Sequence, residues 1–80
     1  MRLDKFLKVS RIIKRRTVAN EACSGERILV NGKEAKPSKE VKPGDVLTVK
    51  FGDKAYSVEV LSVPEGNVSK EKAESLYRPL

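Results

Sequence analysis

Residues 28–33 read Ile-Leu-Val-Asn-Gly-Lys, and this stretch decides where a small sheet begins. The aliphatic residues 28–30 are typical of a buried strand, because such side chains pack well on a pleated surface. Asn31-Gly32 is the strongest two-residue hairpin signal, since both residues tolerate a positive φ. We therefore expect a strand over residues 28–30 that reverses direction at Asn31 and Gly32.

Two more strand patterns follow toward the C-terminus. Residues 42–45 read Lys-Pro-Gly-Asp and suit a type II turn, because Pro sets φ at the second position and Gly accepts a positive φ at the third. Residues 46–51 and 56–60 then alternate apolar with polar side chains, which is the pattern of half-buried strands. The residues between them include Gly52-Asp53, so we expect a second hairpin there.

Two aromatic residues, Phe51 and Tyr56, occupy apolar positions in these alternating patterns. An exposed ring can stack on an RNA base, but the position of both residues in the alternation favours packing in the core. We therefore do not count them among the candidate binding residues.

Two short helices are expected before the first strand. Leu3, Phe6 and Leu7 stand at i, i+3 and i+4, which predicts an amphipathic helix over residues 2–9 with cations on its other side. Residues 10–16 fit either a turn or a continuation of this helix. Helices this short must be stabilised by packing on another element, and the small sheet is the expected partner.

The second helix is predicted to begin at Thr17, which suits an N-cap. Its narrow apolar stripe includes Ala19 and Cys23, and Gly25 stands where a left-handed residue commonly ends a helix. Cys23 is therefore interpreted as a small buried hydrophobe rather than a reactive thiol. The expected fold class is α+β, with two short N-terminal helices packed on a small bent antiparallel sheet.

The last segment has a weaker pattern. We assign one domain to residues 1–63 and a C-terminal tail to residues 64–80. Ser69 suits the N-cap of a short helix that runs through Leu76 before Pro79 ends it, and a frayed tail fits the same residues.

The excess positive charge of the chain lies in its first 17 residues. This segment holds seven Lys and Arg residues and one acid, Asp4, while the remainder is neutral, so the segment accounts for the whole net charge of +6. Segregated charge of this kind suits a polyanion such as nucleic acid, although most short charge runs simply extend into water. Two roles fit Asp4. It can orient Arg2 or Arg11 through a charge-assisted hydrogen bond, or it can form a merely local ion pair.

Three of these cations, Lys14, Arg15 and Arg16, directly precede Thr17 and therefore crowd the positive end of the second helix dipole. Each misplaced charge costs about 0.3 to 1 kcal/mol at low salt, so the arrangement makes better sense when an external anion is present. Phosphate fits, because a helix N-terminus also offers unpaired N–H groups.

The composition excludes several classes of function. The chain has 80 residues, no His and one Cys, so it can form neither an internal disulfide nor a zinc site of thiolate and imidazole ligands. It also lacks a general-base His and a glycine-rich phosphate loop, and we expect no catalysis, cofactor or metal. No apolar stretch approaches the roughly 20 residues of a membrane span. We expect a cytoplasmic monomer that does not contact membranes.

The order of these motifs resembles that of the alpha-L RNA-binding domain, a family named for a protein of the small ribosomal subunit. The resemblance covers about residues 1–51. It implies two helices packed on a small bent sheet, with the helical face and the loop after the hairpin holding structured RNA. The matching motifs are Arg2-Leu3-Asp4-Lys5-Phe6-Leu7, Lys14-Arg15-Arg16-Thr17, Ala19, Ala22, Gly25, Val30-Asn31-Gly32-Lys33 and Lys42-Pro43-Gly44-Asp45.

Charge and resemblance together nominate eight RNA-contacting residues. Six belong to the basic segment, and two belong to the loop that follows the first hairpin. For Lys33 or Lys36 taken singly, a solvated loop lysine is the better interpretation. The candidates are Arg2, Lys5, Arg11, Lys14, Arg15, Arg16, Lys33 and Lys36. We expect them to form one phosphate-facing surface.

The resemblance also implies a function, because here the domain is nearly the whole chain. Small stand-alone bacterial members include a heat-shock type and a type active in ribosome-associated quality control, which supports C-terminal tailing of stalled nascent chains. The absence of a long basic C-terminal extension favours the quality-control type. The implied partners are large-subunit ribosomal RNA, tRNA or peptidyl-tRNA, and a nascent-chain tailing factor. The alternatives are the heat-shock type, which acts on obstructed large subunits, and a constitutive ribonucleoprotein subunit.

Overall fold

The first hairpin forms where the sequence predicts it. In the computed structural model, which describes residues 1–66 and 68–80, β1 (Ile28–Val30) turns into β2 (Lys33–Glu34). The two residues of the turn, Asn31 and Gly32, have φ values of 53° and 84°. Both values are positive, as a two-residue turn of this kind requires. The side-chain oxygen of Asn31 also accepts a hydrogen bond from the backbone N–H of Val46, which fastens the turn to the neighbouring strand.

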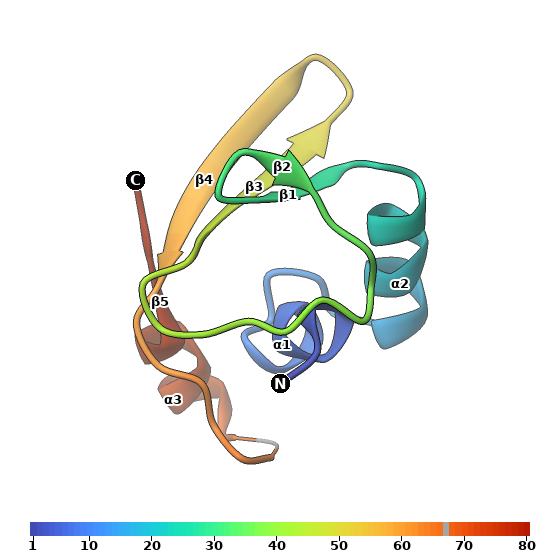
Figure 1. The fold of residues 1–80 in the computed structure, drawn as a ribbon. Coiled ribbons are helices and arrows are strands. Elements are labelled where there is room, and N and C mark those ends of the chain that lie inside the picture. The colour runs from blue at the N-terminus through green and yellow to red at the C-terminus, as the bar shows by residue number, and fades with distance from the viewer. Residues whose placement is uncertain (67) are drawn as a thin grey trace.

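The strands make one antiparallel sheet of five, in the order β2-β1-β3-β4-β5. The remaining strands are β3 (Val46–Phe51), β4 (Lys54–Val60) and β5 (Tyr77–Pro79). Gly44 has a φ of 94°, and the Asp45 N–H donates to the Lys42 carbonyl, which confirms the predicted turn before β3. Figure 1 shows α1 and α3 below the sheet, α2 to its right, and the β3–β4 hairpin extending beyond the helices. The predicted α+β class is therefore confirmed.

The two N-terminal helices are α1 (Leu3–Val9) and α2 (Arg16–Ser24), and they pack against each other. The segment between them is a turn rather than a helical continuation. The prediction that Thr17 caps α2 was wrong, because the N-cap is Arg15, which has an extended backbone and makes no side-chain capping bond. Arg16 instead lies in the first turn, where its Nε is 3.6 Å from Asp4 Oδ2. The N-cap of α2 therefore lies two residues before the position that capping preference favours.

The end of α2 also differs from the prediction. Gly25 has φ −84°, and the left-handed residue is Glu26, with φ 62°. The N–H groups of Glu26 and Arg27 donate to the carbonyls of Cys23 and Ala22, at 3.1 and 2.9 Å. These two bonds make a Schellman motif, whose left-handed position falls one residue beyond the glycine. The prediction placed the right motif on the wrong residue.

The C-terminal segment is ordered into three short elements. The Ser69 side chain accepts a hydrogen bond from the Lys72 N–H and caps α3 (Lys70–Ala73), which continues as the 3₁₀ helix η1 (Glu74–Leu76). The predicted helix is thus confirmed. The chain then forms β5 against β4, a strand that the sequence analysis missed because three residues carry no measurable alternation.

The core lies between the helices and the sheet. Its fully buried side chains include Leu3, Phe6 and Leu7 of α1, which face Ile28 and Leu47 of the sheet within one cluster. Cys23 is buried as predicted. The alternating pattern therefore placed most core positions correctly.

The prediction that Phe51 and Tyr56 pack in the core was wrong, because their side chains are 50% and 46% exposed. Both residues share a face of the sheet with buried Val49, since Tyr56 pairs directly with Val49 and Phe51 lies two residues further along β3. The alternation was correct, but the helices do not cover this end of the hairpin (Figure 1).

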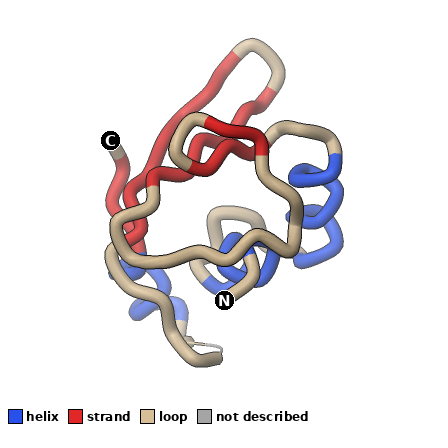
Figure 2. The backbone as a smooth tube through the Cα atoms, viewed as in Figure 1, coloured by secondary structure: helices blue, strands red, loops and turns tan. Residues whose placement is uncertain are grey.

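A long loop connects β2 to β3 and passes across the start of α1 (Figure 2). The N–H groups of Leu3 and Asp4 donate to the carbonyls of Lys39 and Pro37, at 2.7 and 3.1 Å. These bonds satisfy N–H groups that a helix start leaves unpaired. They also hold the loop beside the basic N-terminal segment.

Candidate nucleic-acid interface

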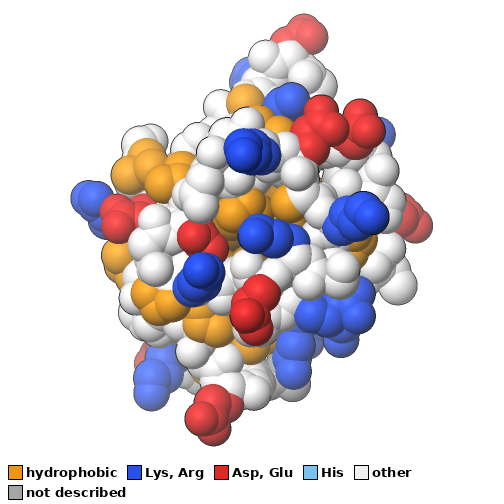
Figure 3. Space-filling model, in the orientation of Figure 1, with side chains coloured by type: hydrophobic (Ala, Val, Ile, Leu, Met, Phe, Trp, Pro, Cys, Tyr) orange, Lys and Arg blue, Asp and Glu red, His pale blue; other side chains and the backbone are white. Residues whose placement is uncertain are grey.

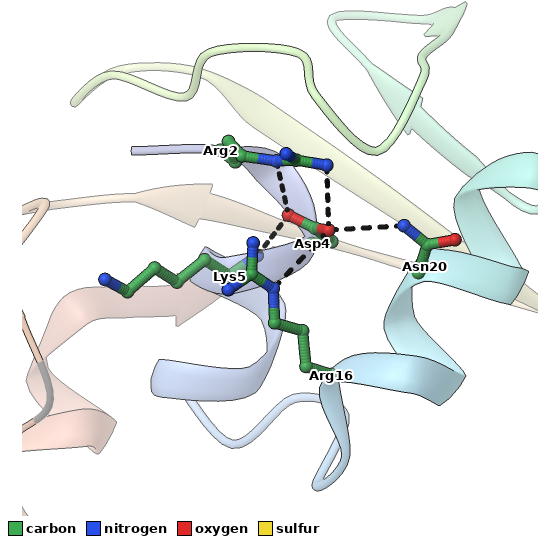
Figure 4. Close-up of polar contacts among 5 residues, drawn as sticks. All are labelled: Arg2, Asp4, Lys5, Arg16 and Asn20. Atoms are coloured by element: carbon green, nitrogen blue, oxygen red, sulfur yellow. Dashed lines mark hydrogen bonds and ion pairs between the residues drawn. The ribbon is translucent and has the colours of Figure 1, made fainter.

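A buried carboxylate, Asp4, organises the basic segment. It is 2% exposed and lies in the first turn of α1. Arg2 donates to it from Nε and Nη2, at 3.2 and 3.3 Å, and the Lys5 backbone N–H donates at 2.8 Å. From α2, Asn20 Nδ2 donates at 3.3 Å and Arg16 makes the ion pair described above. Figure 4 shows Arg2, Arg16 and Asn20 converging on this carboxylate.

These contacts keep Asp4 ionised. Burial by itself would raise the pKa of the carboxyl, but the Asn20 amide, the Arg16 guanidinium, the Lys5 N–H and the Arg2 guanidinium hold that pKa below its ordinary value. Hydrogen bonds and positive charges favour the charged form, and here they outweigh the loss of water. Asp4 is therefore an anion that positions two arginines.

The two arginines keep most of their capacity for an external ligand. Their side chains are 51% and 48% exposed, and one carboxylate balances only one of the two positive charges. A guanidinium has five N–H donors, so N–H groups remain free beyond those directed at Asp4. Arg2 and Arg16 border an open hollow of about 440 Å³ together with Thr17, Asn20 and Glu21. This geometry suits a phosphate group, which accepts paired N–H donors.

The Asp4 contacts decide between the alternatives left open by the sequence. The carboxylate orients Arg2, which was one of the two arginines expected for this role. Its second arginine is Arg16 of α2 rather than Arg11. Lys5 contributes its backbone N–H, while its side chain extends away from the carboxylate (Figure 4).

A second group of cations lies around the end of α1. Arg11 and Lys14 border a hollow of about 360 Å³ with Lys8, and Val9 and Val68 also line it. Arg11 has a φ of 64°, so the chain reverses at this residue and leaves its side chain exposed. No acid lines this hollow among the residues that the structure describes, so all of its charged lining residues are cations.

A third group belongs to β2 and to the loop between β2 and β3. The prediction that Lys33 lies on a loop was wrong, because Lys33 begins β2 and pairs with Val30. Lys33 and Lys36 line a hollow of about 510 Å³ together with Lys39, Glu34 and apolar side chains. The bond from the Asp4 N–H to the Pro37 carbonyl brings this loop, and with it Lys36, to the start of α1. The loop that carries Lys36 therefore contacts the start of α1 although the two are distant in sequence.

Six of the eight nominated cations fall into these three groups rather than gathering round one point. Lys5 of α1 and Arg15, which is exposed at the start of α2, line none of the three hollows. Figure 3 shows Lys and Arg side chains interspersed with Asp and Glu over the drawn face, with blue side chains gathered at the lower right, over the lower end of α2. The candidate interface therefore consists of separate groups of cations rather than one continuous positive patch.

Three residues at these hollows were missed by the sequence analysis. Asn20 stands four positions after Arg16, so helical spacing already placed the two on one face of α2. Lys8 follows Lys5 by three positions on the polar side of α1. For Lys39 no local signal exists, because only the fold of the loop brings it to the hollow.

No helix within residues 1–66 and 68–80 is both long enough and apolar enough to cross a bilayer. Residues 1–47 match the family model described as "S4 domain". Over 77 residues the chain is 57% identical to the RQC P-site tRNA stabilizing factor of Halalkalibacterium halodurans and 54% identical to that of Bacillus subtilis. These alignments span 96% of this chain and 86% and 88% of the two relatives.

The fold is also that of a solved protein. The trimeric structure of Vibrio cholerae Heat Shock Protein 15 superposes with a TM-score of 0.90 at 31% identity, covering all of this chain and 81% of that one. The resemblance seen in the sequence motifs is thereby confirmed. A matched model over more than half the chain, together with relatives of this identity, shows that the protein belongs to the S4 domain family.

Proposed function

We propose that this protein is a non-catalytic RNA-binding factor of ribosome-associated quality control. It binds ribosomal RNA of the large subunit and a tRNA that carries the stalled chain, and it thereby supports C-terminal tailing in the cytoplasm. The eight nominated cations make the RNA contacts, with Lys8 and Lys39 added by the structure.

The observation that carries the proposal is the arginine pair on Asp4. Arg2 and Arg16 are held at fixed positions by one buried anion while about half of each side chain stays open to solvent. Fixing the two side chains in advance lowers the entropy cost of binding a phosphate. The same residues would need no buried anion if they served only to keep the protein soluble.

The relatives supply the choice of RNA. Two of them, more than half identical to this chain along nearly its whole length, are named for stabilising a tRNA in the P site. Their names combine tRNA with quality control, which agrees with the function implied by the sequence motifs. The tailing factor is proposed as the protein partner on the same ground.

Salt dependence tests the RNA-binding part of the proposal. Neutralising about five phosphates gives a slope near −4 in a plot of log K against log salt concentration. We expect this slope for tRNA in fluorescence anisotropy titrations of the intact protein. Affinity that is indifferent to salt would contradict an interface built from these cations.

Crosslinking tests the ribosomal part. After ultraviolet crosslinking in cells, the recovered fragments are expected to derive from tRNA and from large-subunit ribosomal RNA. Recovery spread evenly over messenger RNA would contradict the proposal, because it would indicate unspecific polyanion binding.

The heat-shock type remains a second candidate, and the fold shared with Heat Shock Protein 15 favours it. Sucrose gradients separate the candidates. A quality-control factor is expected to comigrate with large subunits only while the tailing factor is present, whereas a heat-shock type factor would stay on obstructed large subunits without it. Equal occupancy of all ribosomes would instead indicate a constitutive subunit.

A further inference from the structure

The β3–β4 hairpin carries two exposed aromatic rings. Phe51 and Tyr56 stack on each other with ring centroids 5.6 Å apart and an angle of 27° between the planes. About half of each side chain is open to solvent. The stack holds the Phe51 ring in a fixed orientation without burying it.

An apolar hollow adjoins this ring. It lies between the 10–14 turn, α2 and β3, and it measures about 220 Å³. Phe51 lines it together with Val18, which is 46% exposed, and with partly buried Ile12 and Ala22. The hollow is smaller than the roughly 300 to 1,000 Å³ of a drug-sized ligand site, so it suits one flat ring.

Two cations border the same hollow. Arg27 and Lys50 line it, with Glu21 as the one acid among its described lining residues. Glu21 also lines the hollow of Arg2 and Arg16, so the two hollows meet along α2. Apolar surface flanked by cations is therefore continuous with the arginine pair.

We propose that this hollow accepts an unpaired RNA base, which stacks on Phe51 while Arg27 and Lys50 contact the adjoining phosphates. The inference rests on the proposed function and adds a single-stranded contact to it. An aromatic platform beside cations is how proteins hold unpaired bases, because every base has a flat π-face and a charged backbone.

Charge favours a nucleotide over the side chain of a protein partner. A purely hydrophobic docking site gains nothing from Arg27 and Lys50, whereas each nucleotide brings one phosphate to them. The turn that supplies Ile12 to this hollow also carries Arg11 and Lys14, which line the neighbouring hollow at the end of α1.

The test compares two RNA probes, a blunt stem–loop and the same stem–loop with a single-stranded 3′ extension containing 2-aminopurine. We expect the extension to raise the affinity of the intact protein and its fluorescence to be quenched on binding. Phe51→Leu keeps the apolar volume but removes the ring. It is expected to bind the extended probe roughly 5- to 150-fold more weakly, the range for losing one base–aromatic stack.

Three controls isolate the ring. Phe51→Tyr retains a flat face and should keep both the affinity and the quenching. Leu61→Ala removes another exposed apolar side chain, 45% exposed and outside this hollow, and should change neither. Urea unfolding of each variant establishes that the fold is intact before binding is compared.

The outcomes separate this inference from the proposed function. Equal affinity of the wild-type protein for both probes, or full retention of quenching in Phe51→Leu, would overturn the stacking site while leaving phosphate binding in place. If the protein shows no salt-dependent binding to either probe, both the stacking site and the proposed function are overturned. Loss of ribosome association in Phe51→Leu with unchanged binding to the extended RNA would show that the ring contacts a protein instead.

Discussion

Arg2 and Arg16 share one carboxylate although they belong to different elements. Arg2 Nε lies 3.2 Å from Asp4 Oδ1, and Arg16 Nε lies 3.6 Å from Asp4 Oδ2. Like charges repel when nothing separates them, so the buried anion is what allows the two guanidinium groups to point at one place. The same contact joins α1 to α2, which couples the binding surface to the fold.

Replacing Arg16 by Ala is expected to affect both stability and binding. The ion pair is half exposed, so its loss should lower the free energy of unfolding by less than about 1 kcal/mol. RNA affinity should fall about tenfold, since a charge-assisted hydrogen bond contributes about 1.5 kcal/mol. Urea unfolding and tRNA titrations measure the two effects.

Arg15→Ala is the matched control for stability. Arg15 is the neighbouring exposed arginine, and it makes no ion pair among the contacts of the described residues. Its free energy of unfolding should not fall, and it should rise by at most about 0.3 to 1 kcal/mol at low salt, because the change removes a cation from the positive end of the α2 dipole. Equal destabilisation of the two variants would show that Arg16 supports the fold through helix packing rather than through Asp4.

Stability should depend on pH through Asp4. Because the pKa of Asp4 is lowered below 3.8 in the folded protein, its ionised form stabilises the fold above about pH 4. That contribution is lost as the pH falls through the folded-state pKa. In thermal melts, the Tm of the wild type should exceed that of Asp4→Asn near neutral pH, and the difference should shrink as the pH falls below 3.8. A difference in Tm that does not change as the pH falls through this range would contradict the assignment.

Glu26→Gly is expected to stabilise the protein. Glu26 has a φ of 62° at the end of α2, a conformation that glycine adopts without the steric cost of a Cβ. The change also removes a negative charge from the negative end of the helix dipole. We expect a gain of about 0.5 to 1 kcal/mol, or a Tm increase of about 2 to 8 °C.

Glu26→Ala separates the two causes, because it removes the charge and keeps the Cβ. In calorimetric scans of both variants, the Tm of Glu26→Ala should rise clearly less than the Tm of Glu26→Gly. Equal gains would assign the effect to charge alone.

Cys23 should resist alkylation in the folded protein. Burial, with a smaller contribution from the Asp4 charge, raises the pKa of its thiol to about 11, so little thiolate exists near neutral pH. Modification by iodoacetamide, followed by mass spectrometry, is expected to occur at the rate of unfolding and to accelerate in urea. Rapid modification without denaturant would show that the thiol is accessible and that α2 opens locally.

Stability depends on pH in opposite directions through this thiol and through Asp4. Its raised pKa favours the neutral form in the folded state, so its contribution is fully present below the unfolded value near pH 9. Stability is expected to decline as the pH rises from there toward about 11. Cys23→Ala should remove that part of the alkaline decline.

Local patterns predicted most elements of the fold. The Asn-Gly turn, the Pro-Gly turn and the Ser69 cap form as expected because each depends on the conformational preferences of one or two residues. The end of α2 was misplaced by one residue, since the Schellman hydrogen bonds, not the glycine, decide which residue turns left-handed. The strand β5 was missed because its pairing with β4 is entirely a long-range contact.

The candidate site was only partly predictable. Charge identified the basic segment, yet nothing in the sequence showed that Asp4 would bind Arg16 and Asn20 from the next helix. Alternation placed Phe51 and Tyr56 on the correct face of the sheet, but it carries no information on where the covering helices end.

The sequence by itself determined the α+β class, the turns and the segregation of positive charge, because these follow from properties of single residues and their near neighbours. Only the tertiary structure decided which cations stand together and which rings remain exposed. Both depend on how far α2 and the long loop extend over the sheet, and that distance is set by packing between segments far apart in the chain.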